Sequence, residues 1–191
     1  MEAWRLIVSD YYRGYAYKRE SESRLRLLMV PRLVTNSSLH ANILVRLMVA
    51  TPRWLSYLWR RILISQHACD IARDISIGPG LELPHPFAIA IGANSHIGAN
   101  VCIHHGVSIG PVRSRWVPGT SGDPDAVVVI EDEVILYPYC QVLGVNKRVG
   151  RGSQVGALQI LTDDLPPGAL YARGKVRLPS ERLPEFSGRS E

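Results

Sequence analysis

Three side chains in the middle of this 191-residue chain could carry out acid–base chemistry: Asp70, His85 and His105. An imidazole gains and loses a proton near neutral pH, and a carboxylate beside it fixes its tautomer and stabilises its charged form. Such a pair is suited to removing the proton of a hydroxyl group. The aspartate precedes both histidines, and the three are well separated along the chain. They can act together only if the fold brings these positions to one face.

A six-residue repeat of branched aliphatic residues predicts such a fold. Its period matches neither the 3.6 residues of a helix nor the alternation of an ordinary strand. It is typical of a β-helix, in which each hexad forms a short strand and a corner, and three hexads form one coil. A glycine-rich sandwich is the alternative, but it does not explain so many positions in register. The ladder residues are Ile71, Ile77, Leu83, Ile89, Ile91, Ile97, Ile103, Ile109, Ile130, Leu136, Val142, Val149, Val155 and Leu161.

The repeat places His85 and His105 next to each other. Each follows a ladder residue by two positions, so both side chains are predicted to face outward. Their separation equals one coil plus a two-residue slip of the rhythm, which puts them on successive coils about 4.8 Å apart. Asp70 stands at the entry to the first coil. We therefore predict that His85 is a general base held by Asp70.

Metal binding is the weaker interpretation of this cluster. His104 and His105 are adjacent and cannot easily both point at one ion, whereas a zinc site needs three or four converging ligands. No metal site is predicted, and His104 and His96 are interpreted as surface residues without a role.

A second small or apolar residue often stands four positions after a ladder residue, for example Leu81 and Phe87.

Composition and charge describe a globular protein with a basic first third. The hydrophobic content of 46% predicts one domain with an extension. The three cysteines include no Cys-x-x-Cys pair, which favours reduced thiols and a cytoplasmic location. Residues 1–65 carry 11 Lys or Arg and 4 Asp or Glu, a net charge of +7, whereas the remainder carries −2. No signal peptide or bilayer-spanning stretch is expected.

The basic first third fits either a membrane surface or a helical cap on the β-helix, and we favour the cap. No nucleic-acid-binding motif is present, so no nucleic-acid partner is expected. The run 36–38 supplies capping side chains for a helix over 38–50. Thr51 is the expected N-cap of the next helix, with Pro52 at its first position.

The expected organisation has three parts. Residues 1–66 form an α-helical segment, and residues 67–178 form the β-helix. An excursion loop at 111–128 is rich in proline, glycine and serine, and a loop of that length in a compact repeat is usually functional or mobile. Residues 179–191 form a flexible tail.

The stretch from Asp70 to Pro84-His85 resembles the segment of serine O-acetyltransferases that begins Asp-Ile-His-Pro and ends at the catalytic histidine, with the same spacing. The resemblance continues over residues 101–110, 130–144 and 149–166, and more weakly over the helices at 44–64. The chain is thus similar to the serine acetyltransferase-like branch of the hexapeptide-repeat acyltransferases, which includes colanic-acid-type polysaccharide acetyltransferases. This resemblance implies a mainly β fold, a left-handed parallel β-helix with a short α-helical N-terminal segment.

The resemblance also implies a reaction. Acetyl-CoA is the expected co-substrate and donates its acetyl group to a hydroxyl, with His85 as general base and Asp70 orienting it. In the family, CoA lies in a groove between subunits of a trimer. That groove matches Gly144, Gly156 and Ala157 here, with Arg173 or Lys175 near the pyrophosphate. On the acceptor side the candidate residues are Glu20, His105, Arg113 and Arg115.

Departures from the family pattern concern the acceptor. The family has an aspartate before the catalytic histidine, where this chain has Pro84. It has an Arg-His pair after the loop, where this chain has Ala126 and Val127. Arg113 and Arg115 either replace the missing arginine or are solvated loop charges. Serine or a related small hydroxy compound is expected. A sugar, a polysaccharide precursor and an unusual amino-acid-like acceptor of specialised metabolism stay open.

The expected assembly is a homotrimer, since a triangular prism packs naturally about a threefold axis and shares its groove. A dimer of trimers, joined through the helical segment, is the alternative. Two other classes of function also stay open: a non-catalytic scaffold, and a protein bound to a membrane surface through its basic first third.

Overall fold

A computed structural model describes residues 2–14, 31, 35–111 and 127–181. Three helices come first: α1 (Glu2–Gly14), α3 (Ser37–Ala50) and α4 (Arg53–His67). Fourteen short strands and a final 3-10 turn (Pro179–Glu181) follow in the described part of the chain. The strands are β1 (Asp70–Ile71), β2 (Ser76–Ile77), β3 (Ala90–Ile91), β4 (Ser95–Ile97), β5 (Cys102–Ile103), β6 (Ser108–Gly110), β7 (Val128–Ile130), β8 (Ile135–Leu136), β9 (Gln141–Leu143), β10 (Lys147–Val149), β11 (Gln154–Val155), β12 (Ile160–Leu161), β13 (Leu170–Ala172) and β14 (Lys175–Arg177).

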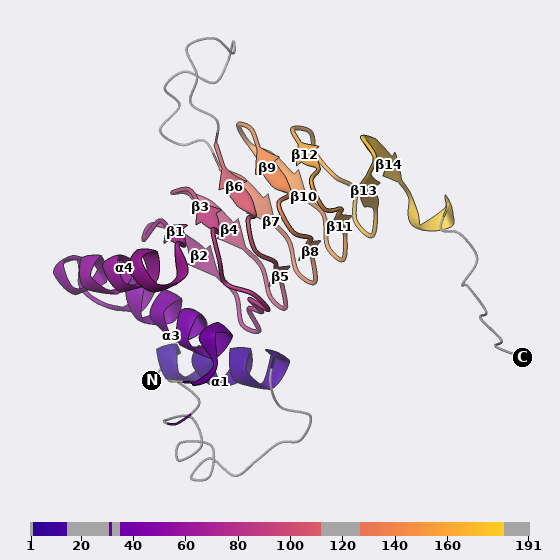
Figure 1. Cartoon of the computed structure of the whole chain (residues 1–191). Coiled ribbons are helices and arrows are strands. Elements are labelled where there is room, and N and C mark those ends of the chain that lie inside the picture. Colours follow the sequence, from indigo (N-terminus) through magenta and orange to yellow (C-terminus); the bar gives the residue numbers. More distant parts are fainter. Residues whose placement is uncertain (1, 15–30, 32–34, 112–126, 182–191) are drawn as a thin grey trace, which may run out of the picture.

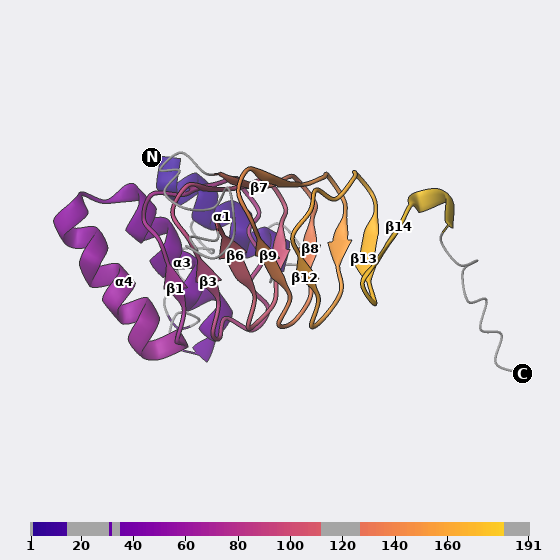
Figure 2. The same ribbon diagram turned by 90° about the horizontal axis from the view of Figure 1, so that it is seen from above.

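The strands form three sheets that wrap around one axis. Sheet A has the order β1-β3-β6-β9-β12, sheet B β10-β7-β4-β2, and sheet C β14-β13-β11-β8-β5. Every neighbouring pair is parallel except β13 and β14. The coils lie one after another from the helices to the C-terminal end (Figures 1 and 2). This is the β-helix that the six-residue repeat predicts.

The register of the sheets locates each irregularity of the repeat. Ala90 pairs with Ser108, which stands one regular coil of three hexads further along the chain. Glu82 bridges to Cys102, which is one coil and two positions further along, so two extra residues lie between Glu82 and Ala90. Ser108 pairs with Gln141, and this longer step includes the predicted excursion loop, most of which (112–126) lies outside the described residues. The two-residue slip therefore belongs to the turn that carries His85.

The ladder residues fill the interior. All are buried except Ile77, which is half-buried and packs against the same core. The second apolar position is buried at Leu81, Val107 and Val134, among others, but Phe87 is exposed. Phe87 differs from these positions because the two extra residues displace it from the wall into the turn.

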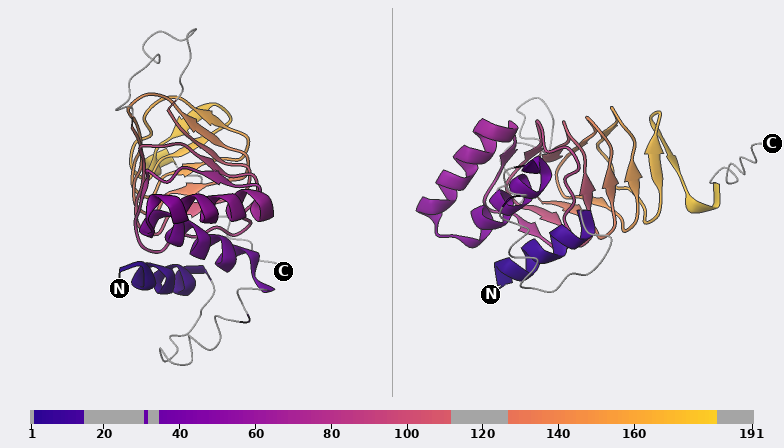
Figure 3. Two further views of the ribbon diagram at one scale, coloured as in Figure 1. Left: turned by 90° about the vertical axis from the view of Figure 1, so that its left-hand side faces the viewer. Right: turned by 60° about the horizontal axis from the view of Figure 1, so that its bottom comes forward.

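Helix α3 covers the open end of the β-helix, together with α4 (Figure 3). Three polar residues of α3, spaced four apart and therefore on one helix face, are buried: Ser38, Asn42 and Arg46. Each donates hydrogen bonds to carbonyls of the first coil. Asn42 Nδ2 donates to Leu81 (3.2 Å), and Arg46 donates to Ile77 and Gly78 (2.8 and 2.6 Å). This polar stripe replaces the strand partners that the first coil lacks.

Helix α1 contributes the matching acceptor. Asp10, fully buried, accepts two hydrogen bonds of 2.8 Å from Arg46 and one of 2.9 Å from the Leu81 backbone N–H. Arg46, which interrupts the apolar run from Ile43 to Ala50, thus forms a buried ion pair with Asp10. It joins α1, α3 and the first coil.

The helix starts differ from the expected ones by small steps. Asn36 is the N-cap of α3, accepting from the Leu39 N–H, so Ser38 is free to bond to the β-helix. Pro52, not Thr51, is the N-cap of α4, and the Thr51 hydroxyl donates to the Leu47 carbonyl at the end of α3 instead. In the described part of the chain no helix is both long and apolar enough to cross a bilayer.

Arg46→Met is expected to lower the free energy of unfolding by about 3–5 kcal/mol, because it leaves the buried Asp10 carboxylate without its partner. Burial raises the pKa of Asp10, and the Arg46 guanidinium opposes that rise. In the variant the guanidinium no longer opposes it, so the folded state favours the protonated acid and loses stability as pH rises through that raised pKa.

Urea unfolding should therefore show a larger loss of unfolding free energy in Arg46→Met, relative to wild type, at pH 7.5 than at pH 5. Arg53→Met, at an exposed arginine of α4, is the matched control. A deficit that equals the control, or one that is independent of pH, would contradict the buried pair.

Candidate active site

His85 lies in a proline-flanked turn at the corner between sheets C and A. Pro84 and Pro86 fix their own backbone angles and restrict the residue before them, so the turn around His85 is stiff by sequence alone. The Phe87 N–H donates to the His85 carbonyl (2.8 Å), which closes the turn. The imidazole is exposed, as predicted for a residue outside the ladder.

The His85 and His105 rings lie side by side, as their spacing predicts. Their centroids are 6.0 Å apart at an interplanar angle of 69°. His105 also meets the Tyr139 ring edge-on, at 5.1 Å. Its Nδ1 is buried and has no hydrogen-bond partner among the described residues. An unpaired buried nitrogen beside an exposed imidazole is a place where a bound polar group would gain a hydrogen bond.

Gly106 makes this contact possible. Its φ is +70°, and a Cβ at this position would stand 2.3 Å from the Tyr139 ring. Any other residue would push that ring away from His105. The neighbouring His104 stacks on Tyr137 at 5.6 Å, and its pKa is lowered by burial and then by the charges of His105 and His85. His104 is therefore a packed, neutral residue and not a solvated one.

Asp70 is held by Arg60. Both hydrogen bonds from the guanidinium, from Nε at 3.0 Å and from Nη2, end on Asp70 Oδ1. The Asp70 backbone N–H donates to the Ile89 carbonyl (2.8 Å), so the residue sits beside the stretch that follows His85. No hydrogen bond joins the Asp70 and His85 side chains in the described part of the chain. The carboxylate has its Oδ2 available, because neither Arg60 bond uses it.

Below His85 the same corner is repeated coil after coil. The Gly106 N–H donates to the Phe87 carbonyl, the Tyr139 N–H to His105, and the Leu158 N–H to Pro138 (2.8, 3.0 and 3.1 Å). Gly156 and Ala157 come directly before Leu158. The turn at Arg173 adjoins them, since the Gly174 N–H donates to the Gln159 side chain (2.9 Å). Lys175 pairs with Ala172 across that turn.

Gly144 lies at a different corner. Its N–H points to the Gly110 carbonyl (3.4 Å), at the corner between sheets A and B. Its φ of +152° is open only to glycine, and a Cβ there would meet the Lys147 side chain at 2.6 Å. Sheet A therefore separates Gly144 from the corner with Gly156 and Ala157. Glu20, Arg113 and Arg115 lie outside the described residues.

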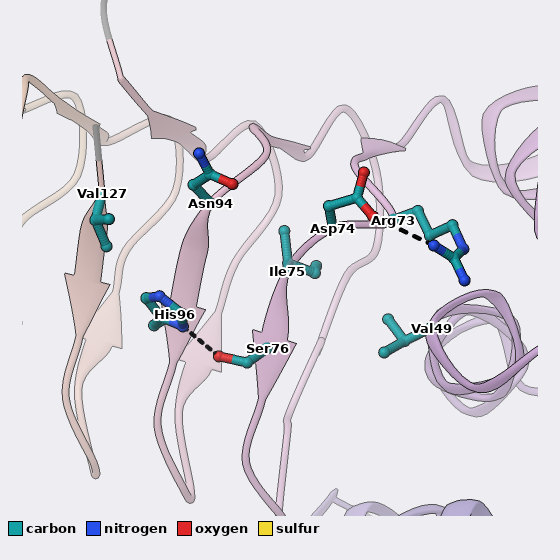
Figure 4. A pocket seen from close by; sticks show the side chains of 8 residues that line it. All are labelled: Val49, Arg73, Asp74, Ile75, Ser76, Asn94, His96 and Val127. Atoms are coloured by element: carbon teal, nitrogen blue, oxygen red, sulfur yellow. Dashed lines mark hydrogen bonds and ion pairs between the residues drawn. The ribbon is translucent and has the colours of Figure 1, made fainter. Parts of the chain in front are cut away.

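A separate open groove of about 590 Å³ lies over the start of sheet B (Figure 4). Its polar lining includes an ion pair between Arg73 and Asp74 at 3.3 Å. Ser76 and His96 are joined by a 2.6 Å hydrogen bond, so His96 is not an isolated surface residue. Val127, which stands where the family has its histidine, lines this groove directly before β7 of sheet B, whereas His85 lies at the corner between sheets C and A.

The cysteines are not available as nucleophiles. Cys69, Cys102 and Cys140 are buried and unpaired. Burial, with a smaller effect of the Glu82 charge, raises the pKa of Cys102 to about 12, and burial raises that of Cys140 to about 12. Thiols of this kind stay protonated. Among the described residues no three His, Cys, Asp or Glu side chains are grouped so that they could hold a metal ion.

Sequence reasoning missed the residues that support the turn. Ser38 Oγ bonds to the Leu83 carbonyl and lies 2.8 Å from that of Pro84. His67, at the end of α4, bonds to the backbone of Pro86, while its Nε2 lies 3.0 Å from His40 Nδ1. The available signal was the spacing of Ser38, Asn42 and Arg46. Polar residues at every fourth position of an otherwise apolar helix indicate one buried polar face.

Comparisons with known proteins give relatives of one kind, although no family model matches the chain. A plasmid-encoded serine acetyltransferase of Synechococcus elongatus is 26% identical over 182 residues, 92% of this chain and 55% of the relative. The serine acetyltransferase of Bacillus licheniformis is 30% identical over 144 residues, 70% of this chain and 60% of the relative. The chain thus spans about half the length of the curated relatives it matches.

Solved structures show the same fold. Serine acetyltransferase isoform 3 from Entamoeba histolytica, in complex with cysteine, superposes with a TM-score of 0.70 at 17% identity, covering 91% of this chain and 59% of that one. Soybean serine acetyltransferase complexed with serine gives 0.68 at 22% identity, covering 92% and 69%. These likenesses confirm the predicted fold, a left-handed β-helix of hexapeptide repeats.

Proposed function

We propose that this serine acetyltransferase-like chain is an O-acyltransferase that moves the acetyl group of acetyl-CoA to the hydroxyl of serine or a related small hydroxy compound. One observation carries the proposal: an exposed imidazole, His85, begins a continuous corner of the β-helix and has a second imidazole beside it. The curated relatives and the solved structures described above are serine acetyltransferases, which supports the same reaction.

The chemistry follows from general-base catalysis. His85 takes the proton of the acceptor hydroxyl as its oxygen attacks the thioester carbonyl carbon of acetyl-CoA. A carbon–oxygen bond forms, the carbon–sulfur bond breaks, and the CoA thiolate leaves with the proton returned from the imidazolium. No covalent enzyme intermediate is needed, in agreement with the buried, protonated thiols.

The corner that leads away from His85 suits an elongated co-substrate. From the His85 turn to the Arg173 turn it crosses four steps between paired strands of sheet C, or about 19 Å at 4.8 Å each. In our proposal the thioester of acetyl-CoA lies at His85, and the rest of the co-substrate extends along the corner past Gly156 and Ala157. Arg173 and Lys175 then attract the pyrophosphate. Gly144 lies on the far side of sheet A, so any contact from it must come from another subunit.

Asp70 is proposed to orient His85 through its Oδ2 atom, which the pair with Arg60 leaves available. Arg60 then fixes the carboxylate, and the carboxylate fixes the imidazole tautomer. Such an arrangement stabilises the imidazolium that forms during proton transfer. His105, with its unpaired Nδ1, is proposed to contact the acceptor, together with Glu20, Arg113 and Arg115 from outside the described residues.

A sugar hydroxyl is the second candidate acceptor. Pro84 removes a carboxylate beside His85 that would bind an amine, and Val127 lies in a groove on sheet B. Both changes favour an acceptor without a free amino-acid backbone, such as a polysaccharide precursor. The acceptor therefore has to be decided by assay.

A homotrimer is the proposed assembly, located in the cytoplasm as its unpaired thiols favour. Exposed apolar side chains run along the corner and its flank: Phe87, Tyr139, Leu158 and Ile160, of which Leu158 is 75% exposed. Such a row is typical of a surface that a second subunit covers. A second subunit at this corner would also close the groove over the co-substrate.

His85→Ala is expected to slow acetyl-CoA-dependent thiol release by roughly 10²–10⁴-fold, because the hydroxyl loses its general base. The assay measures CoA release with L-serine, other hydroxy amino acids and sugars as acceptors. His96→Ala is the matched control, since it removes an exposed histidine of sheet B and should keep full activity. Equal losses in both variants, or none in His85→Ala, would contradict the proposed base.

Asp70→Asn is expected to lower kcat by roughly 10- to 100-fold with the KM for acetyl-CoA unchanged, because the neutral amide no longer stabilises the imidazolium. Arg60→Gln removes the partner but keeps the carboxylate, and an exposed ion pair contributes only about 0–1 kcal/mol to stability. Its melting temperature should therefore stay close to that of wild type, and its kcat should fall less than that of Asp70→Asn because the carboxylate remains. Full activity of Asp70→Asn would remove Asp70 from the mechanism.

Light scattering of the purified protein is expected to give a mass three times that of the chain. Leu158→Asp should dissociate the trimer, because it places a charge in the apolar contact. Trp54→Asp, on the exposed face of α4, should leave the trimer intact. A monomeric wild-type protein would disprove the assembly, and a Trp54-dependent mass of twice the trimer would indicate the dimer of trimers.

A further inference from the structure

We propose that Ser38 and His67 are positioning residues that clamp the turn carrying His85, so that the helical cap determines where the base points. The inference rests on the proposed function only for the role of His85. The clamp itself consists of contacts between the helices and the turn, and it can be measured without a substrate.

Ser38 holds the turn on its N-terminal side. The side chain is buried on α3, and its hydroxyl bonds to the Leu83 carbonyl while lying 2.8 Å from the Pro84 carbonyl. One hydroxyl proton is thus shared between two neighbouring carbonyls directly before His85. Because Pro84 has no N–H, this stretch of backbone has few other ways to be fixed.

His67 holds the turn on its C-terminal side. It is buried at the end of α4, and it bonds to the backbone of Pro86, whose only possible contribution is its carbonyl. Its own carbonyl accepts from the Ala88 N–H at 3.3 Å. Backbone groups on both sides of His85 are therefore tied to helices, in addition to the bond from the Gly106 N–H of the next coil to the Phe87 carbonyl.

His40 sets the tautomer of this clamp. Its Nδ1 lies 3.0 Å from His67 Nε2. If His67 donates from Nδ1 to Pro86, its Nε2 must accept, and His40 donates the shared proton; these roles are assigned from the bonding network. Burial, followed by the nearby His40, lowers the pKa of His67 and keeps the ring neutral, as this arrangement needs.

The turn needs such a clamp because it departs from the wall of the β-helix. Two residues more than a regular hexad lie between Glu82 and Ala90, so the segment cannot stack fully on the coil below. Without the clamp, the carbonyls of Leu83, Pro84 and Pro86 would be exposed to water, and the turn would be more mobile. A displacement of the base of about 1 Å is enough to cost roughly 10²-fold in rate.

The test uses the full chain with Ser38→Ala and His67→Phe, each of which removes one donor. Ser38→Thr and His67→Asn keep a donor at the same place. Asn42→Ala is the matched control, since it removes the same kind of buried bond to the first coil one helical turn away from the His85 turn. The readouts are kcat, the KM for acetyl-CoA, and amide hydrogen exchange at Phe87 and Ala88.

We expect kcat to fall roughly 10- to 100-fold in Ser38→Ala and His67→Phe with KM unchanged. Exchange at Phe87 and Ala88 should be faster in both, and at least one conservative variant should restore both readouts. Asn42→Ala should lower the melting temperature but leave kcat and this exchange unchanged.

Equal effects in Asn42→Ala would show that general stability, not positioning, is responsible, and would overturn the proposal. Unchanged exchange in Ser38→Ala and His67→Phe would overturn it as well. If the wild-type protein transfers no acetyl group to any acceptor, the proposed function fails, and hydrogen exchange alone then decides whether the clamp exists.

Discussion

The first coil of a β-helix has a row of backbone carbonyls and N–H groups with no preceding strand to pair with, and this open edge is the constraint on which the rest of the structure depends. Leaving it bare would expose the ladder to water and invite pairing with other chains. Here it is closed by side chains. Asn42 and Arg46 donate to the carbonyls of Ile77, Gly78 and Leu81, and Asp10 accepts the Leu81 N–H. The helices therefore complete the hydrogen bonding of the first coil and close that end of the β-helix.

The same closure extends to the candidate base. Ser38 stands one turn before Asn42 on the same face of α3, and its carbonyl partners adjoin His85. His67, at the end of α4, completes the contact from the other side of the turn. One set of helix–coil hydrogen bonds thus stabilises the fold at one end and fixes the base at the other. Substitutions of Arg46 should therefore affect mainly stability, whereas substitutions of Ser38 and His67 should affect mainly catalysis.

Much of the fold could be predicted from the sequence because the ladder depends only on residue type and period. The neighbouring rings of His85 and His105 follow from the same period. The pairing of Arg46 with Asp10 could not be predicted, since these residues meet only when α1 docks under α3. Ser38 looked like a helix cap for a related reason, because a serine near a helix start is usually one. The exposure of Phe87 does not follow from the period, because a period cannot show on which side of a slip the extra residues fall.

The slip itself explains why the base is where it is. In a regular hexad each residue is held on a wall or at a corner by backbone bonds to the neighbouring coils, so a catalytic side chain would have little freedom to approach a substrate. Two extra residues between Glu82 and Ala90 lift the chain away from the wall and present His85 to solvent. That departure leaves the turn with few hydrogen bonds to the next coil, such as the one from the Gly106 N–H to the Phe87 carbonyl, and the flanking prolines remove two N–H donors as well. The helices supply the remaining contacts to the turn, since the base lies on the first coil, within reach of α3 and α4.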